Sequence, residues 1–265
     1  MNGKVYLVGA GPGDPELLTV KAYRILREAD VVLHDNLVNP AILELASPAS
    51  QIVNVGKRCG RRDITQSEIN SRMVEYARAG LAVVRLKGGD PLVFGRAGEE
   101  MEALREAEVE FEIVPGVTAA FAAAAAAGIP LTDRRLASSL VFLTGHLAAG
   151  KNHQGRSGWP ALDPPDATPG DASARTIVVY MPGNDYAQMA SELRTAGVAA
   201  QTPCLVVSDA SSGDEEVHLA TVATLPESPR LPSPKLLIVG AVAGLARDTR
   251  LKHETSDAEM VCIRS

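Results

Sequence analysis

The sequence predicts a two-domain α/β protein. Its first domain would hold a mostly parallel sheet with helices on both faces, and its second a mixed sheet. Short apolar runs alternate with helical patterns through the first half, which is typical of βαβ units. Pro115 and Gly116 interrupt this alternation, and strand-like runs then outnumber helical ones. The second half therefore favours more antiparallel pairing than the first.

The first half gives the clearer elements. The predicted strands are 4–9, 31–34, 51–55, 81–86 and 111–114, and the predicted helices are 17–29, 40–46, 66–79 and 97–107. The third of these helices is the best marked, because Thr65 and Glu68 have the spacing of a capping box. It also places Ile69, Met73 and Tyr76 on one face.

The second half begins with an alanine-rich helix near 119–127. The predicted strands are 139–144, 176–181, 203–207, 217–221 and 235–239, with a helix over 185–196. A long surface loop rich in Gly, Pro, Ser and Asp is expected over 148–174. We place an N-terminal domain at 1–115, a C-terminal domain at 116–246 and a polar tail at 247–265.

Composition excludes several classes of protein. The chain has 265 residues and a net charge of −6, which disfavours a nucleic-acid-binding surface. Its longest apolar stretch, 119–127, is far shorter than the ~20 residues that span a bilayer, so no membrane partner is expected. Cys59, Cys204 and Cys262 are isolated and no signal peptide is visible, so a disulfide framework is unsupported and we expect a cytoplasmic protein.

The first strand runs into a glycine-rich turn with glycines at 9, 11 and 13. Glycine has no Cβ, so its backbone N–H groups can approach a ligand closely. This predicts a nucleotide-like ligand at the carboxyl end of the strand. The dinucleotide pattern G-x-G-x-x-G is not met, because Asp14 takes its last position.

A second glycine loop follows the fourth strand, at Gly88, Gly89 and Asp90. Ligands of open α/β sheets bind at the carboxyl ends of the strands, where this loop would lie. A tight turn capped by Asp90 would have the same sequence pattern. Asp35 and Lys57 also follow strands and could transfer protons, or could be solvated loop charges.

Other residues leave similar alternatives open. Thr118 at a helix start can hold a carboxylate or a ribose, or can be a plain N-cap. Arginines in loops, such as Arg96 and Arg134, suit a polyanionic ligand or an ordinary surface. The sequence has no H-E-x-x-H motif and no close cluster of His and Asp residues, so no metal site is expected.

Several motifs in one order make the sequence resemble a known family. They are Val8-Gly9-Ala10-Gly11-Pro12-Gly13-Asp14, His34-Asp35-Asn36-Leu37-Val38, Val55-Gly56-Lys57-Arg58, Val84-Arg85-Leu86-Lys87-Gly88-Gly89-Asp90-Pro91, Phe94-Gly95-Arg96, Val114-Pro115-Gly116-Val117-Thr118-Ala119-Ala120, Gly128-Ile129-Pro130-Leu131-Thr132 and Thr144-Gly145-His146. Together they are similar to the uroporphyrinogen-III C-methyltransferases of the tetrapyrrole methylase family. The resemblance runs from about residue 3 to 245 and is dense up to His146.

The resemblance implies a fold, a reaction and partners. It implies the two-domain tetrapyrrole methylase fold, usually as a homodimer, with S-adenosyl-L-methionine in the cleft between the domains. The implied reaction methylates two pyrrole carbons of uroporphyrinogen III in succession. It yields precorrin-2, for siroheme or cobalamin, and S-adenosyl-L-homocysteine, and it requires no metal.

The resemblance also implies site residues. The implied donor contacts are Pro12, Gly88, Gly89, Asp90, Val93, Thr118, Ala119, Met181 and Ala210. Asp35 would be the proton acceptor and Lys57 the proton donor. The implied tetrapyrrole contacts are Arg96, Glu99, Arg134, His146 and Met181.

The chain departs from the family pattern at a few positions. His34 stands where the family usually has tyrosine, Asn36 replaces an arginine, and Pro182 follows Met181 where glycine is common. No dehydrogenase-like segment precedes residue 3, so a fused siroheme-forming enzyme is not expected. The alternatives are a methyltransferase for a later precorrin, a nucleotide-dependent oxidoreductase and a catalytically inactive binding protein.

Overall fold

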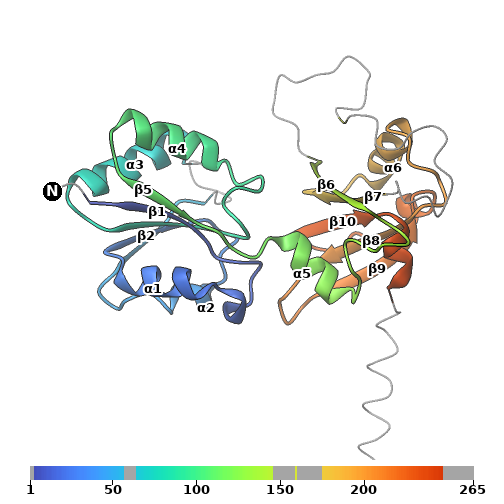
Figure 1. The fold of residues 1–265 in the computed structure, drawn as a ribbon, viewed down its shortest axis with the longest axis horizontal. Helices are drawn as coiled ribbons and strands as arrows, with labels where there is room; N and C mark the ends of the chain where they lie inside the picture. Colours follow the sequence, from blue (N-terminus) through green and yellow to red (C-terminus); the bar gives the residue numbers. More distant parts are fainter. Residues whose placement is uncertain (1–2, 57–63, 146–158, 160–174, 247–265) are drawn as a thin grey trace, which may run out of the picture. The chain divides into compact units, whose positions relative to one another are not determined.

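We describe the protein from a computed structural model that covers residues 3–56, 64–145, 159 and 175–246. The chain divides into two compact units. Unit 1 comprises residues 1–122 together with the short segment 210–213, and unit 2 comprises 123–209 and 214–265. Figure 1 shows the elements of each unit. The domain limits expected at 115 and 246 stay a prediction.

Unit 1 is built on a five-stranded sheet with the order β3-β2-β4-β1-β5. Its strands are β1 (Val5–Gly9), β2 (Val31–His34), β3 (Gln51–Asn54), β4 (Val83–Lys87) and β5 (Phe111–Val114). Every pairing between them is parallel, which confirms the class predicted from the βαβ alternation. The carboxyl ends of these strands therefore share one edge of the sheet.

Helices cover both faces of this sheet. They are α1 (Val20–Glu28), α2 (Pro40–Leu43), α3 (Gln66–Arg78) and α4 (Ala97–Glu106). In Figure 1, α1 and α2 lie on one face, and α3 and α4 on the other. Side chains that alternate along the strands fill both layers: Val8 and Val84 pack toward α1 and α2, and Leu7 and Val83 toward α3 and α4.

Local capping explains where two helices begin. The Thr65 side chain accepts from Glu68 N while the Glu68 carboxylate accepts from Thr65 N, so the predicted capping box of α3 is confirmed. The first helix, however, starts at Val20 rather than at residue 17. Thr19 caps it by accepting from Ala22 N, and the preceding residues form the short 3₁₀ helix η1 (Pro15–Leu17).

Unit 2 carries the mixed sheet that the sequence predicted. Its order is β6-β7-β10-β8-β9, with β6 and β7 parallel and the other pairs antiparallel. The strands are β6 (Ser139–Thr144), β7 (Arg175–Tyr180), β8 (Pro203–Ser208), β9 (Glu216–Thr221) and β10 (Lys235–Val239). The remaining elements are α5 (Ala119–Ala126), which crosses the division between the units, α6 (Tyr186–Thr195), η2 (Leu225–Glu227) and η3 (Ala241–Leu245).

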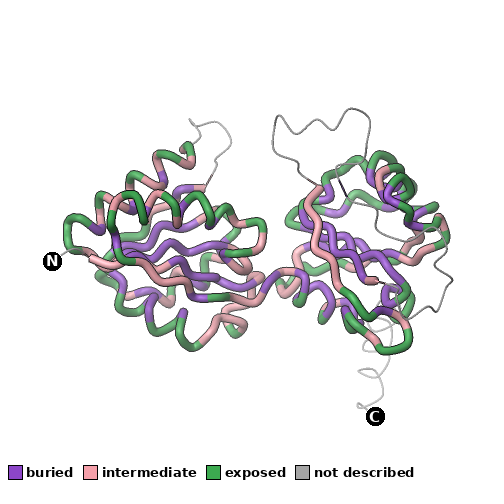
Figure 2. The backbone as a smooth tube through the Cα atoms, turned by 45° about the horizontal axis from the view of Figure 1, so that its top comes forward, coloured by how far each residue is buried: buried purple, intermediate pink, exposed green. Residues whose placement is uncertain are grey.

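Each unit has its own apolar core. Figure 2 shows buried residues along the central strands of both sheets and exposed residues along the outer sides of the helices. In unit 2 one cluster joins α6 to its sheet and includes Met189, Leu193 and Val206. Among the described residues, no helix has the length and apolar character needed to cross a bilayer.

Candidate functional site

Four loops that the structure describes throughout leave the carboxyl edge of the unit 1 sheet. They follow β1, β2, β4 and β5 and consist of residues 10–14, 35–39, 88–96 and 115–118. The loops after β1 and β4 are tied together, because Gly89 N donates to Gly11 O at 2.7 Å and Gly11 N donates to Gly89 O at 3.2 Å. The two glycine loops that the sequence singled out are thus neighbours.

Three glycines pack backbone against backbone where these loops meet. A Cβ on Gly116 would lie 2.4 Å from the Gly89 carbonyl oxygen, and a Cβ on Gly9 would lie 2.6 Å from Gly116 N. Neither distance leaves room for a side chain. Glycine at 9 and 116 is therefore required by the packing of the loops.

Gly89 itself is different. Its φ is +69°, a conformation that favours glycine, yet the nearest atom to a Cβ built there is Ala119 N at 3.8 Å. The space beside it is open, so the position could accept a ligand where the other two glycines could not. Gly88 is tighter, with Leu37 Cβ 3.1 Å from its Cβ position.

The carboxylate of Asp90 braces this arrangement. Its Oδ2 accepts from Gly116 N at 3.0 Å and its Oδ1 accepts from Leu92 N at 2.8 Å. Sequence reasoning assigned Asp90 to the donor. The structure gives it a definite second task, which is to hold the loops after β4 and β5 together.

The other implied donor residues of unit 1 lie in or next to these loops. Pro12 is in the first loop, Val93 is in the third, and the buried Thr118 precedes α5. Ala210 adjoins Ser211, whose hydroxyl accepts from Asp14 N at 3.3 Å in the first loop. Met181 belongs to unit 2, where it has a φ of +51° and is 49% exposed.

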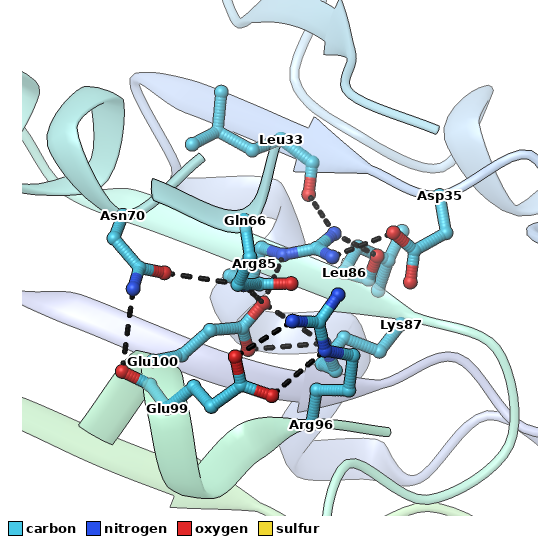
Figure 3. A network of polar contacts seen from close by, with 10 residues as sticks. All are labelled: Leu33, Asp35, Gln66, Asn70, Arg85, Leu86, Lys87, Arg96, Glu99 and Glu100. Carbon is cyan, nitrogen blue, oxygen red and sulfur yellow. Dashed lines mark hydrogen bonds and ion pairs between the residues drawn. The ribbon is translucent and has the colours of Figure 1, made fainter. Parts of the chain in front are cut away.

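Beneath this edge lies a chain of ion pairs that connects Asp35 to the layer between the sheet and α4 (Figure 3). Arg85 Nη2 donates to Asp35 Oδ1 at 2.6 Å, and Arg85 Nε donates to Glu100 Oε1 at 2.9 Å. Lys87 Nζ donates to both carboxylate oxygens of Glu100, at 2.9 and 3.0 Å. We call Asp35, Arg85, Lys87 and Glu100 the Asp35 cluster.

Most of this cluster is shielded from water. The side chains of Arg85 and Glu100 are 2% and 0% exposed, whereas that of Asp35 keeps 29%. Burial lowers the pKa of Lys87, and the positive charge of Arg85 adds to that effect. Burial also acts to lower the pKa of Arg85, but Asp35 and Glu100 outweigh it and the pKa is raised.

Sequence analysis missed Arg85, Lys87 and Glu100 as parts of the site. A signal was present, because Arg85 and Lys87 alternate with apolar residues in a central strand and so share one face. Charges there are rarely buried without partners. Gln66 of α3 completes the contacts by donating to Glu100 Oε1 at 3.2 Å.

Arg96 and Glu99, both predicted to face the tetrapyrrole, form a bidentate pair with each other at 2.7 and 2.6 Å. This hydrogen bonding raises the pKa of Arg96 and lowers that of Glu99. Both side chains are about half exposed, at 56% and 51%. Arg96 has a φ of +57°, so the turn before α4 is held in a strained form.

The structure gives less information on the other predicted site residues. Lys57 and His146 lie outside the described residues. Arg134 is exposed in unit 2, and the neighbouring Asp133 pairs with Arg135 rather than with it. His34 is buried, with Nδ1 3.0 Å from Asp35 O. In the described part of the chain, no three His, Cys, Asp or Glu residues are grouped so that they could hold a metal.

An open parallel sheet with joined glycine loops and an acidic residue at its carboxyl edge defines an α/β protein that binds a nucleotide-like ligand there. The sequence model of the protein family Tetrapyrrole (Corrin/Porphyrin) Methylases matches residues 4–226 of this chain. The chain belongs to this family.

Individual relatives agree with that assignment. The chain is 42% identical over 259 residues to siroheme synthase of Nitrosomonas europaea, covering 96% of this chain and 52% of that protein. It thus spans about half the length of such relatives. The uroporphyrin-III C-methyltransferase of Thermus thermophilus, solved in complex with S-adenyl homocysteine, is 42% identical with a TM-score of 0.75. That match covers 92% of this chain and all (100%) of the other. A cobalt precorrin-4 methyltransferase is 31% identical, with a TM-score of 0.74 and coverage of 91% and 95%.

Proposed function

We propose that this chain is an S-adenosyl-L-methionine-dependent uroporphyrinogen-III C-methyltransferase that methylates two pyrrole carbons and yields precorrin-2. The observation that carries the proposal is the open position beside Gly89, held between the first glycine loop and the start of α5, on the sheet edge that also bears Asp35. A ligand backbone can approach there without meeting a side chain.

The residues around this position fit the methyl donor. The donor supplies an electrophilic methyl group together with its own leaving group. We assign its binding to Pro12, Gly88, Gly89, Asp90, Val93, Thr118, Ala119, Met181 and Ala210. The open space beside Gly89 lets a nucleoside approach the backbone of this loop, and the Asp90 brace fixes the loops before the donor arrives.

The proposed substrate gives a task to the exposed Arg96, which lies in the loop after β4. Uroporphyrinogen III carries several carboxylates, and an arginine pairs with a carboxylate through two parallel hydrogen bonds. We assign Arg96, Arg134, His146 and Met181 to the tetrapyrrole, with Glu99 orienting Arg96. Asp35 is the proposed proton acceptor and Lys57 the proposed proton donor. A homodimer in the cytoplasm is part of this proposal.

The relatives favour this reaction over the alternatives. Identity to the Thermus thermophilus uroporphyrin-III enzyme is 42%, against 31% to the cobalt precorrin-4 enzyme. Family membership favours methyl transfer over an oxidoreductase. The carboxylate of Asp35, held at the loop edge by Arg85, favours an active enzyme over a binding protein.

A matched pair of glycine variants tests the donor site. Gly89 and Gly128 have φ values of +69° and +64°, and neither has an atom closer than 3.8 Å to its Cβ position. Alanine therefore strains the backbone equally at both. We expect Gly89→Ala to weaken donor binding by roughly 10-fold, measured by calorimetric titration, because a side chain would enter the ligand space. Gly128→Ala is the control and should bind normally.

Equal donor affinity in the two variants would remove Gly89 from the site. The reaction itself is tested by incubating the wild-type protein with labelled donor and uroporphyrinogen III. We expect a product that carries two added methyl groups. Transfer only to a later precorrin would support that alternative instead.

A further inference from the structure

The Asp35 cluster contains three charged groups to which neither the predicted reaction nor the donor site gives a task. Arg85 and Lys87 lie on β4, and Glu100 lies on α4. Their side chains are 2%, 4% and 0% exposed, so a substrate cannot touch them directly. Their influence on chemistry would have to pass through the partly exposed Asp35.

The contacts form one directed chain. Glu100 Oε1 accepts from Arg85 Nε, and the far end of the same guanidinium, Nη2, donates to Asp35 Oδ1. The guanidinium also donates through Nη1 to the backbone carbonyls of Leu33 and Leu86, at 3.4 and 3.3 Å (Figure 3). Because the guanidinium is planar, fixing Nε and Nη1 fixes the direction of Nη2.

The charges of the cluster balance. Arg85 and Lys87 bring two positive charges, and Asp35 and Glu100 bring two negative ones. Loss of the Glu100 charge would leave two buried cations facing Asp35 alone. The extra positive charge would stabilise the carboxylate of Asp35, and a more stable carboxylate is a weaker proton acceptor.

We propose that Glu100 is a positioning residue for methyl transfer, which orients Arg85 and offsets the Lys87 charge so that Asp35 stays aligned and basic. This inference rests on the proposed function, in which Asp35 accepts the proton. Arg85 bonds Oδ1, so Oδ2 is the oxygen assigned to that proton. The nearby Arg96–Glu99 pair makes its own bidentate contact and is not part of this chain.

A double-mutant cycle tests the proposal. In the wild-type background, Glu100→Gln should lower single-turnover methyl transfer by roughly 10-fold, with donor affinity unchanged. Asp35→Asn should lower it by roughly 100-fold, since the base is removed. In the Asp35→Asn background, Glu100→Gln should change the rate by less than about 2-fold, because its effect passes through the missing carboxylate.

A charge-restoring variant guards against a failure to fold. Lys87→Met with Glu100→Gln removes one charge of each sign, and the glutamine oxygen can still accept from Arg85 Nε. We expect this double variant to fold and to recover most of the activity lost in Glu100→Gln. Its donor affinity and circular dichroism spectrum should match those of the wild type.

The outcomes separate the two proposals. An equal loss from Glu100→Gln in both backgrounds, or no recovery on charge restoration, would overturn the positioning role. A wild-type protein without transfer to uroporphyrinogen III would overturn the proposed function. Full activity in Asp35→Asn would overturn the base assignment, and the positioning role would fall with it. As a charge-matched control, Glu112→Gln at the opposite end of the sheet should leave transfer unchanged.

Discussion

Two clusters with the same charge composition stand at opposite ends of the unit 1 sheet. The Asp35 cluster is at the carboxyl end. The other, which we call the Lys4 cluster, contains Lys4, Lys21, Glu110 and Glu112 at the amino end. Each has two cations and two anions. The Lys4 cluster is open to solvent, with side chains between 30% and 73% exposed.

The comparison of the two clusters shows how the effect of an ion pair on stability depends on its burial. Exposed pairs gain little, because water and salt screen them. Buried pairs lose the free energy of hydration of both charges, and their mutual attraction barely offsets that loss. Replacing a buried pair with apolar residues therefore often leaves a protein as stable as before. A buried cluster of charge at the edge that carries the glycine loops is therefore better explained by chemistry than by stability.

Removing one anion from each cluster should give the largest contrast. Glu100→Ala leaves Arg85 and Lys87 buried with only Asp35 to balance them, and should lower the free energy of unfolding by ~3–5 kcal/mol. Glu112→Ala removes an exposed partner and should give only a slight loss of stability. Urea titration followed by circular dichroism measures both. A small, equal change in the two variants would show that burial does not distinguish the clusters.

The Arg96–Glu99 pair sharpens the comparison, because it is exposed like the Lys4 cluster yet lies at the carboxyl edge. Arg96→Ala should lower kcat/KM for the tetrapyrrole by ~10-fold or more, from loss of a charged hydrogen bond of about 1.5–3 kcal/mol. Arg105→Ala, at the other end of α4, is the control. A fall in donor affinity without a change toward the tetrapyrrole would place Arg96 in the donor site instead.

The smallest expected effect is the pH dependence of the Lys4 cluster. Hydrogen bonds from Lys21 and Lys4 lower the pKa of Glu112. Its contribution to stability is therefore present above the pKa of the unfolded chain, about 4.3, and is lost as the pH falls through the folded value. The slight advantage of the wild type over Glu112→Gln in urea should shrink as the pH falls below about 4.3 and disappear below the lowered folded pKa of Glu112. An advantage that grows on acidification would contradict the assignment.

Most of the fold could be predicted from the sequence because its signals are local. Runs of Val, Ile and Leu marked the strands of both sheets, and Thr65 with Glu68 marked the start of α3. Strand order is not local. The pairing of β4 with both β1 and β2 depends on contacts between residues far apart in the chain, which no short pattern records.

The difference between local signals and long-range contacts also applies to the candidate site. The glycine loops and Asp35 could be found, since each directly follows an apolar run. Glu100 could not, because an acid in the first turn of a helix is common on solvated surfaces and is favoured there by the helix dipole. Only the placement of α4 over β4 brings it to Arg85. Asp90 was singled out as a predicted donor contact, while its bonds to Gly116 and Leu92 required the structure.

The contact of Gly9, Gly89 and Gly116 also bears on the order in which the protein assembles during synthesis. Gly9 leaves the ribosome before its packing partners, Gly89 and Gly116, which follow β4 and β5. No shorter nascent chain can close the three loops on one another. The contact between these loops can thus form only after Gly116 has been synthesised, when all the strands that support it are available to pair.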